Sequence, residues 1–259
     1  MINTKPNTLP RILFFLVIIV CFNSCDTNES LIFRKRTIAI DDFFDCQTTN
    51  CVITEILLVE SITESKVSKS INRVIEKAAY GVLNFEDDAS LDTIEKALQN
   101  FNTSYQEILK EFPEEIIPYE ASIYSDVSFQ NSDILSIVID SYLFTGGAHG
   151  SGNTRYLNMD LKTGKLIENK KLLNNYDEFS SFAEKAFRKT YEIPEDASIN
   201  STGFFFENET FILPTNIGIT DDHLILWYNQ YEIASYAEGP IELKFNKKEV
   251  SNFFSVDIL

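Results

Sequence analysis

The 259-residue sequence is poor in histidine and in basic residues, and each shortage narrows the functions it can have. Its two histidines, His149 and His223, lie far apart with no third, so an ordinary histidine-rich metal site is not expected. Against 39 acidic residues stand 22 basic ones, a formal net charge of −17. So acidic a surface repels nucleic acid and anionic headgroups, and it serves either solubility or a cationic partner.

The sequence also lacks the common catalytic motifs. It has no Gly-x-Ser-x-Gly elbow, phosphate-binding loop, dinucleotide fingerprint or His-Glu-x-x-His segment. Glu232 and Glu238 could form the carboxylate pair of a glycoside hydrolase, but proximity means little among 39 acidic residues. We therefore predict a chain that is not an enzyme, with no catalytic residue, no metal and no cofactor.

The N-terminus has the pattern of a lipoprotein signal sequence over residues 1–24. Lys5 and Arg11 precede an unbroken apolar run at residues 12–20, and Phe22-Asn-Ser-Cys25 resembles a lipobox. The run is shorter than the roughly 20 residues that span a bilayer, which favours cleavage over an uncleaved anchor. Loss of Lys5 and Arg11 with the leader lowers the formal charge from −17 to −19.

This leader predicts a cell-envelope protein held to a membrane by lipid on Cys25, on the periplasmic or the cell-surface face. The sequence leaves open which membrane carries it. Residues 25–36 are predicted to form a tether, residues 37–162 a first α+β domain and residues 163–259 a second.

Cys46 and Cys51 remain in the exported part, separated by four polar residues. In an oxidising compartment such a pair favours a small disulfide loop between two hairpin strands. Metal binding is the alternative, although two thiolates alone do not complete a site.

Hydrophobic periodicity predicts an α+β fold with a mostly antiparallel sheet, three main helices and two closely packed subdomains. The helices are expected at residues 62–80, 90–111 and 178–191, with a short one from 247. The strands are expected at residues 37–44, 52–60, 119–129, 134–144, 153–160, 204–206, 210–213, 223–228 and 241–245.

Two segments provide candidate ligand-binding residues. Gly146 and Gly147 give backbone freedom at a strand end, and His149 follows at the tip. His149 either contacts a ligand or hydrogen-bonds local backbone and fixes the loop. Tyr228, Tyr231 and Tyr236 cluster near Trp227, either as a binding surface for a protein or a sugar, or as packing residues.

These segments carry a family resemblance. The segment Tyr142-Leu-Phe-Thr-Gly-Gly-Ala-His149 resembles the signature of the extracytoplasmic domain at the N-terminus of PdaC-type peptidoglycan deacetylases. The segment from Leu224 to Pro240, which contains Tyr-Glu-Ile-Ala-Ser-Tyr-Ala-Glu-Gly-Pro, resembles its companion domain. The paired arrangement is similar to the extracellular part of RsiV-type lysozyme-sensing anti-sigma factors and covers residues 37–255.

The resemblance implies a binding or sensing module for a lysozyme-like protein or for cell-wall glycan. An anti-sigma factor would need a cytoplasmic segment before a membrane span, and only eleven residues precede Ile12. A deacetylase of this type would need a further catalytic domain. Neither role is therefore expected, and a peptidoglycan-modifying enzyme and a structural envelope protein are the alternatives.

Overall fold

The computed structural model describes residues 31–47, 50–85, 90–113 and 117–259. The predicted signal sequence, the lipidation site Cys25 and residues 26–30 of the predicted tether lie outside these ranges. Within them, no helix is both long enough and apolar enough to cross a membrane.

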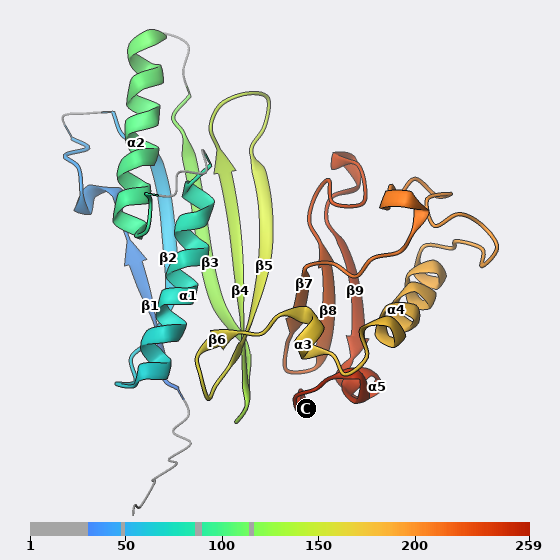
Figure 1. Cartoon of the computed structure of the whole chain (residues 1–259). Helices are drawn as coiled ribbons and strands as arrows, with labels where there is room; N and C mark the ends of the chain where they lie inside the picture. The colour runs from blue at the N-terminus through green and yellow to red at the C-terminus, as the bar shows by residue number, and fades with distance from the viewer. Residues whose placement is uncertain (1–30, 48–49, 86–89, 114–116) are drawn as a thin grey trace, which may run out of the picture.

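The first domain is a six-stranded sheet with two helices on one face (Figure 1). In sheet order the strands are β1 (Phe33–Ile38), β2 (Ile53–Ser61), β3 (Glu120–Gln130), β4 (Ile134–Phe144), β5 (Ser151–Asp160) and β6 (Lys165–Leu166). All neighbours are antiparallel except β2 and β3, which are parallel. A parallel pair needs a long crossover, and α1 (Lys66–Leu83) and α2 (Ile94–Glu111) supply it.

The core of the first domain is mainly aliphatic and lies between the sheet and these helices. Ser65 and Thr93 cap the helices by accepting hydrogen bonds from the backbone N–H groups of Ser68 and Lys96. Each helix has one apolar face, and the strands bury alternate residues beneath it. The largest fully buried side chains here include Ile56, Ile71, Ile75, Leu83, Ile94, Leu98, Phe101 and Ile123.

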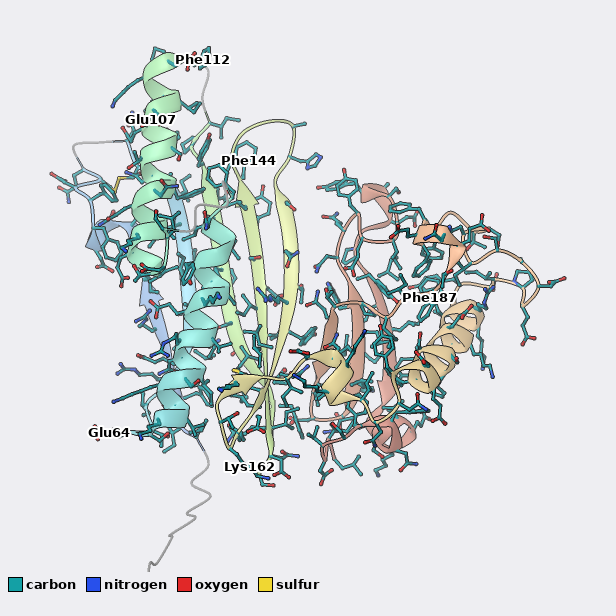
Figure 2. All side chains as sticks on the ribbon, in the orientation of Figure 1. Glu64, Glu107, Phe112, Phe144, Lys162 and Phe187 are labelled. Atoms are coloured by element: carbon teal, nitrogen blue, oxygen red, sulfur yellow. A yellow bond between two sulfur atoms is a disulfide. The ribbon has the colours of Figure 1, made fainter. Side chains whose placement is uncertain are left out.

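The second domain is a three-stranded antiparallel sheet packed against a helix. The sheet contains β7 (Asn216–Ile219), β8 (His223–Tyr228) and β9 (Ile241–Asn246), and α4 (Tyr176–Thr190) is the long helix. Phe187 lies between α4 and the neighbouring loops (Figure 2). Short elements complete the fold: α3 (Asn169–Leu172), α5 (Lys247–Val250) and the 3-10 helices η1 (Ile40–Asp42), η2 (Glu207–Glu209), η3 (Tyr236–Glu238) and η4 (Ser251–Phe253).

The α+β class, the mostly antiparallel sheet and the Cys46–Cys51 disulfide are confirmed. The tether prediction was wrong for residues 33–36, which belong to β1. Arg34 and Lys35 belong to this strand and form ion pairs with Glu60 and Asp126, so charges that suggest a solvated linker instead stabilise a strand.

The predicted strands at residues 204–206 and 210–213 are also wrong. These residues are loop on either side of η2, while the strand of this region, β7, follows at Asn216. The loop residues Phe206, Phe211 and Leu213 are buried, so their apolar pattern reflects burial without sheet pairing.

Candidate functional site

The two domains meet where β7 lies against β5. Asparagine side chains of the second domain form hydrogen bonds with the backbone of β5 there. The backbone N–H of Thr154 donates to Oδ1 of Asn229 at 2.8 Å, and Nδ2 of Asn229 donates to the Thr154 carbonyl at 3.0 Å. One residue pair further along β5, the N–H of Tyr156 donates to Oδ1 of Asn216 at 3.3 Å. The edge of β5 is therefore covered here by side-chain amides, which take the hydrogen bonds that a neighbouring strand would take.

The Tyr156 ring of the first domain packs closely against the backbone of Gly218 in the second. A Cβ atom built on Gly218 of β7 would lie 2.5 Å from this ring, so only glycine fits there. Burial, and then the nearby carboxylates of Asp140 and Glu242, raise the pKa of Tyr156 to about 12. The phenol is therefore protonated at neutral pH.

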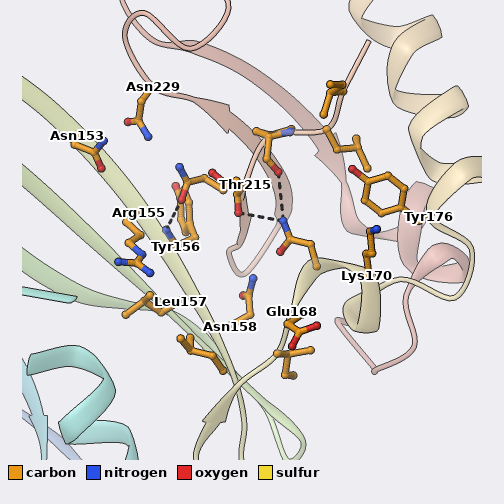
Figure 3. Close-up of a pocket in the computed structure, with 17 residues that line it drawn as sticks. Asn153, Arg155, Tyr156, Leu157, Asn158, Glu168, Lys170, Tyr176, Thr215 and Asn229 are labelled. Atoms are coloured by element: carbon orange, nitrogen blue, oxygen red, sulfur yellow. Dashed lines mark hydrogen bonds between the residues drawn. The ribbon is translucent and has the colours of Figure 1, made fainter. Parts of the chain in front are cut away.

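Beside this junction lies the interdomain cleft, an open hollow of about 780 Å³ (Figure 3). β5 forms one wall, and α3, the start of α4 and residues 212–216 form the other. Nδ2 of Asn169 holds the second wall by donating to the carbonyls of Pro214 at 3.3 Å and Thr215 at 3.0 Å. The polar side chains that line the cleft are Asn153, Arg155, Tyr156, Asn158, Glu168, Asn169, Lys170, Tyr176, Thr215, Asn216 and Asn229.

Asn158 supplies a hydrogen-bond acceptor whose partner is missing. Its residue is 4% exposed, and its Nδ2 donates to the Ile217 carbonyl at 2.6 Å. Its Oδ1 is buried and accepts no hydrogen bond from the described residues. A buried amide oxygen without a partner is costly, and this one is closed to solvent, so it is a local cost to the fold at the domain junction.

The charged side chains of the cleft are Arg155, Lys170 and Glu168. Glu168 pairs with Lys171 at 3.2 Å. Arg155 and Lys170 form no hydrogen bond or ion pair within the described ranges, and they project from opposite walls (Figure 3). Among the described lining residues Glu168 carries the only carboxylate.

Three predicted binding residues, His149, Tyr231 and Tyr236, contact one another between the two domains and form what we call the aromatic patch. The rings of His149 and Tyr236 stack across the two domains with centroids 4.3 Å apart, and Tyr231 lies 5.5 Å from Tyr236. The side chains are exposed, Tyr231 to 58% and Tyr236 to 38%. Nδ1 of His149 also lies 3.0 Å from the Gly150 carbonyl, so the ring helps to fix its loop.

Gly146 and Gly147 belong to the same loop, with φ of 97° and 87°, which is the left-handed region that glycine favours. The structure places Tyr228 elsewhere. Tyr228 is 1% exposed in the core of the second domain, and its hydroxyl donates to the Ile212 carbonyl at 2.6 Å. Burial raises its pKa strongly. Of the two interpretations of Tyr228 that the sequence left open, the structure therefore supports packing in the core and not ligand binding.

Sequence reasoning missed the cleft residues Asn158, Arg155, Lys170 and Tyr176. They come from β5, α3 and α4, and only the docking of the two domains brings them together. Isolated asparagines and single charges give no periodic signal, so no motif could have found them. Across the described residues, no group of three or more His, Cys, Asp or Glu side chains could hold a metal ion.

With this geometry the class of protein is defined as a two-domain α+β module with a cleft at the domain junction. Residues 46–152 match a family model described as "Deacetylase PdaC", and residues 166–248 match one described as "Protein of unknown function (DUF3298)". The two matches follow one another along the chain, which is the pairing that the sequence resemblance predicted.

Solved structures that share the fold include two members of the DUF3298 family. A DUF3298 family member from Bacteroides fragilis NCTC 9343 is 18% identical with a TM-score of 0.66, covering 88% of this chain and 95% of that one. A DUF3298 family protein from Pseudomonas aeruginosa PAO1 is 20% identical with a TM-score of 0.59, covering 90% and 98%. No curated protein matches the sequence. The family matches support an extracytoplasmic, cell-wall-associated module.

Proposed function

We propose that this protein is a non-enzymatic lipoprotein of the cell envelope that binds cell-wall glycan in its interdomain cleft. The lining of that cleft is the observation that carries the proposal. Its volume, about 780 Å³, falls in the range of ligand sites, roughly 300 to 1,000 Å³. Amide and phenol groups line it, and such groups pair with the hydroxyl and acetamido groups of a glycan.

The carboxylate content of the cleft favours binding over hydrolysis. A glycoside hydrolase of the common type places two carboxylates across the scissile bond, about 5 to 9.5 Å apart. Glu168 is the only carboxylate among the described lining residues, and it is paired with Lys171. A cleft with this lining can hold a sugar, but it lacks the acid and base pair that cleaves one.

Sedimentation with insoluble peptidoglycan tests the proposal. We expect the purified protein to sediment with the wall material and the double variant N153A/Y176F to bind about tenfold more weakly. The variant removes two cleft groups for which the structure shows no side-chain hydrogen bond, and each such bond contributes about 0.5 to 1.5 kcal/mol.

The control variant N252A/Y80F makes the same two changes outside the cleft and should bind like the unmodified protein. Failure of the unmodified protein to sediment at low ionic strength would refute glycan binding.

A basic protein such as lysozyme is the second candidate partner, favoured by the formal charge of −17. Aromatic side chains anchor many protein interfaces, and the aromatic patch offers exposed rings for this purpose. Calorimetric titration with lysozyme separates the two candidates. Protein binding would weaken as salt rises and would respond to Y231A, whereas glycan binding would respond to N153A/Y176F.

A further inference from the structure

The first domain has one end at which the chain enters it. β1 begins there at Phe33, opposite Ser61 at the end of β2, and α1 begins there too (Figure 1). The turn between β5 and β6 packs against the start of α1, because the Ser70 hydroxyl donates to the Gly164 carbonyl at 2.9 Å. These segments lie together and form what we call the entry end, residues 31–32, 62–70 and 160–165.

Two exposed isoleucines lie side by side at the entry end. Ile32 is 61% exposed and Ile62 is 48% exposed. The Ile62 N–H donates to the Ile32 carbonyl at 2.9 Å, and the Ile32 N–H donates to the Thr63 hydroxyl oxygen at 3.2 Å. These bonds extend the register of β1 and β2, so the two side chains lie on one face of the sheet. Their apolar surface is adjacent and fixed in place, and its transfer from water to an apolar phase would be favourable.

The charge of the entry end differs from that of the chain as a whole. Four exposed lysines lie there: Lys66, Lys69, Lys162 and Lys165. The carboxylates of Glu64 and Asp160 lie there as well, and Lys162 pairs with a third, of Asp133, at 3.3 Å. Figure 2 places Glu64 and Lys162 at the same end of the domain. This end is therefore close to neutral, whereas the chain has 39 acidic and 22 basic residues, and it does not repel anionic headgroups as the overall charge does.

The proposed lipid anchor lies close to this end along the chain. Six residues, 26–31, separate Cys25 from Ile32. A chain spans at most about 3.6 Å per residue, so Ile32 lies within roughly 25 Å of Cys25. The opposite end of β2, at Ile53, is nine residues from Ile62, a rise of about 30 Å along the strand. The linking segment is therefore shorter than the domain, which favours an arrangement with the entry end toward the bilayer.

We infer that the entry end is a membrane-contact surface, with Ile32 and Ile62 at the boundary between headgroups and acyl chains and the four lysines among the headgroups. The inference rests on the proposed lipid anchor and goes beyond the proposed glycan binding. Two isoleucines bury too little apolar area to hold a protein to a bilayer, so the acyl chains supply that affinity. The surface sets the orientation of the protein, because it makes one end of the first domain the preferred contact.

Fluorescence quenching in vesicles tests the inference on the acylated full-length protein, purified from membranes in detergent. A polarity-sensitive probe is attached to I62C or to I53C, whose parent residues are similarly exposed, at 48% and 55%, near opposite ends of β2. The other cysteines of the mature protein should not react, because Cys46 and Cys51 form a disulfide and Cys25 is the proposed acylation site. The vesicles contain phosphatidylcholine and phosphatidylglycerol, with a nitroxide-labelled lipid as quencher.

We expect the probe on I62C to be quenched about threefold more strongly than the probe on I53C, because only the first lies within the lipid interface. The probe on I32C should behave like the probe on I62C, which keeps the test open if one variant folds poorly. The double variant K66Q/K69Q should reduce quenching of the probe on I62C. The matched variant K77Q/K110Q removes two exposed lysines elsewhere and should not reduce it.

Equal quenching at positions 62 and 53, or quenching at neither, in a protein that carries fatty acid would overturn membrane contact and leave the lipid anchor intact. A purified protein without fatty acid by mass spectrometry would overturn the lipid anchor as well. Neither outcome bears on binding to insoluble peptidoglycan, which sedimentation measures separately.

Discussion

The two domains are built from different core residues. The first buries mainly isoleucine, leucine, valine and alanine at regular positions on strands and on α1 and α2. The second buries many aromatic rings, several of them on loops, and the partly buried Phe253 of the C-terminal 3-10 turn packs against them. The comparison shows that a small sheet with one long helix can form a core when large side chains from irregular segments fill it, because each aromatic ring buries a large area.

Removing one aromatic ring from the core of the second domain should lower the free energy of unfolding more than any other change considered below. Phe187 contacts Tyr191, Phe204, Phe206 and Phe211 at centroid distances of 4.6 to 5.6 Å. We expect F187A to lower the free energy of unfolding by about 3 to 5 kcal/mol, since a large cavity remains. Urea unfolding followed by the fluorescence of Trp227, the one tryptophan of the chain, measures this.

Phe112 provides the control, because it is 50% exposed on the first domain. F112A should change the free energy of unfolding by less than about 0.5 kcal/mol. If F187A and F112A were equally mild, the aromatic cluster would not be the core of the second domain.

The next largest loss of stability tests whether the packing of β7 against β5 stabilises the protein. G218A would place a methyl carbon 2.5 Å from the Tyr156 ring, so β7 would have to move away from β5. We expect a loss of about 2 to 3 kcal/mol from this overpacking, seen both by Trp227 fluorescence and by far-ultraviolet circular dichroism.

G81A is the matched control, because a Cβ on Gly81 of α1 meets nothing within 4 Å. A helical Gly-to-Ala change there should raise stability by up to about 1 kcal/mol. A G218A protein as stable as the unmodified one would show that the domains do not press on each other at this point.

The smallest expected change in stability appears only at alkaline pH. The Tyr156 phenol has a pKa of about 12 in the folded protein against 10.0 ordinarily, so the unfolded chain loses this proton first. Stability should therefore fall as pH rises between these two values. Y156F keeps the ring on Gly218 and lacks the proton, so its urea midpoint should fall less between pH 8 and pH 11. Equal losses in both proteins would contradict the assignment.

Sequence patterns predicted the first domain well and the second less well, for a physical reason. On α2 the apolar residues Ile94, Leu98, Phe101 and Tyr105 repeat every three or four positions, which identifies a helix with one buried face. Phe206 and Phe211 are equally buried but lie on loops, where burial follows no period. Their apolar pattern therefore suggested strands that do not exist.

The candidate site was predicted only in part. The loop glycines and the rings of His149, Tyr231 and Tyr236 stood out because turn residues and aromatic clusters are visible in sequence. The cleft residues did not, because Arg155 and Lys170 become neighbours of one hollow only after the domains dock. The local sequence pattern does not indicate which distant segments come into contact.

The asparagine-covered edge of β5 has a consequence for how the molecule can be divided. Side-chain amides of Asn229 and Asn216 satisfy that edge, so the six-stranded sheet needs no strand from its neighbour to complete its ladder. If the six-stranded sheet were expressed alone, the backbone groups of Thr154 and Tyr156 would be unpaired. Such an edge can pair with the same edge of a second copy. The companion domain thus shields the sheet from self-association while it shapes one wall of the hollow.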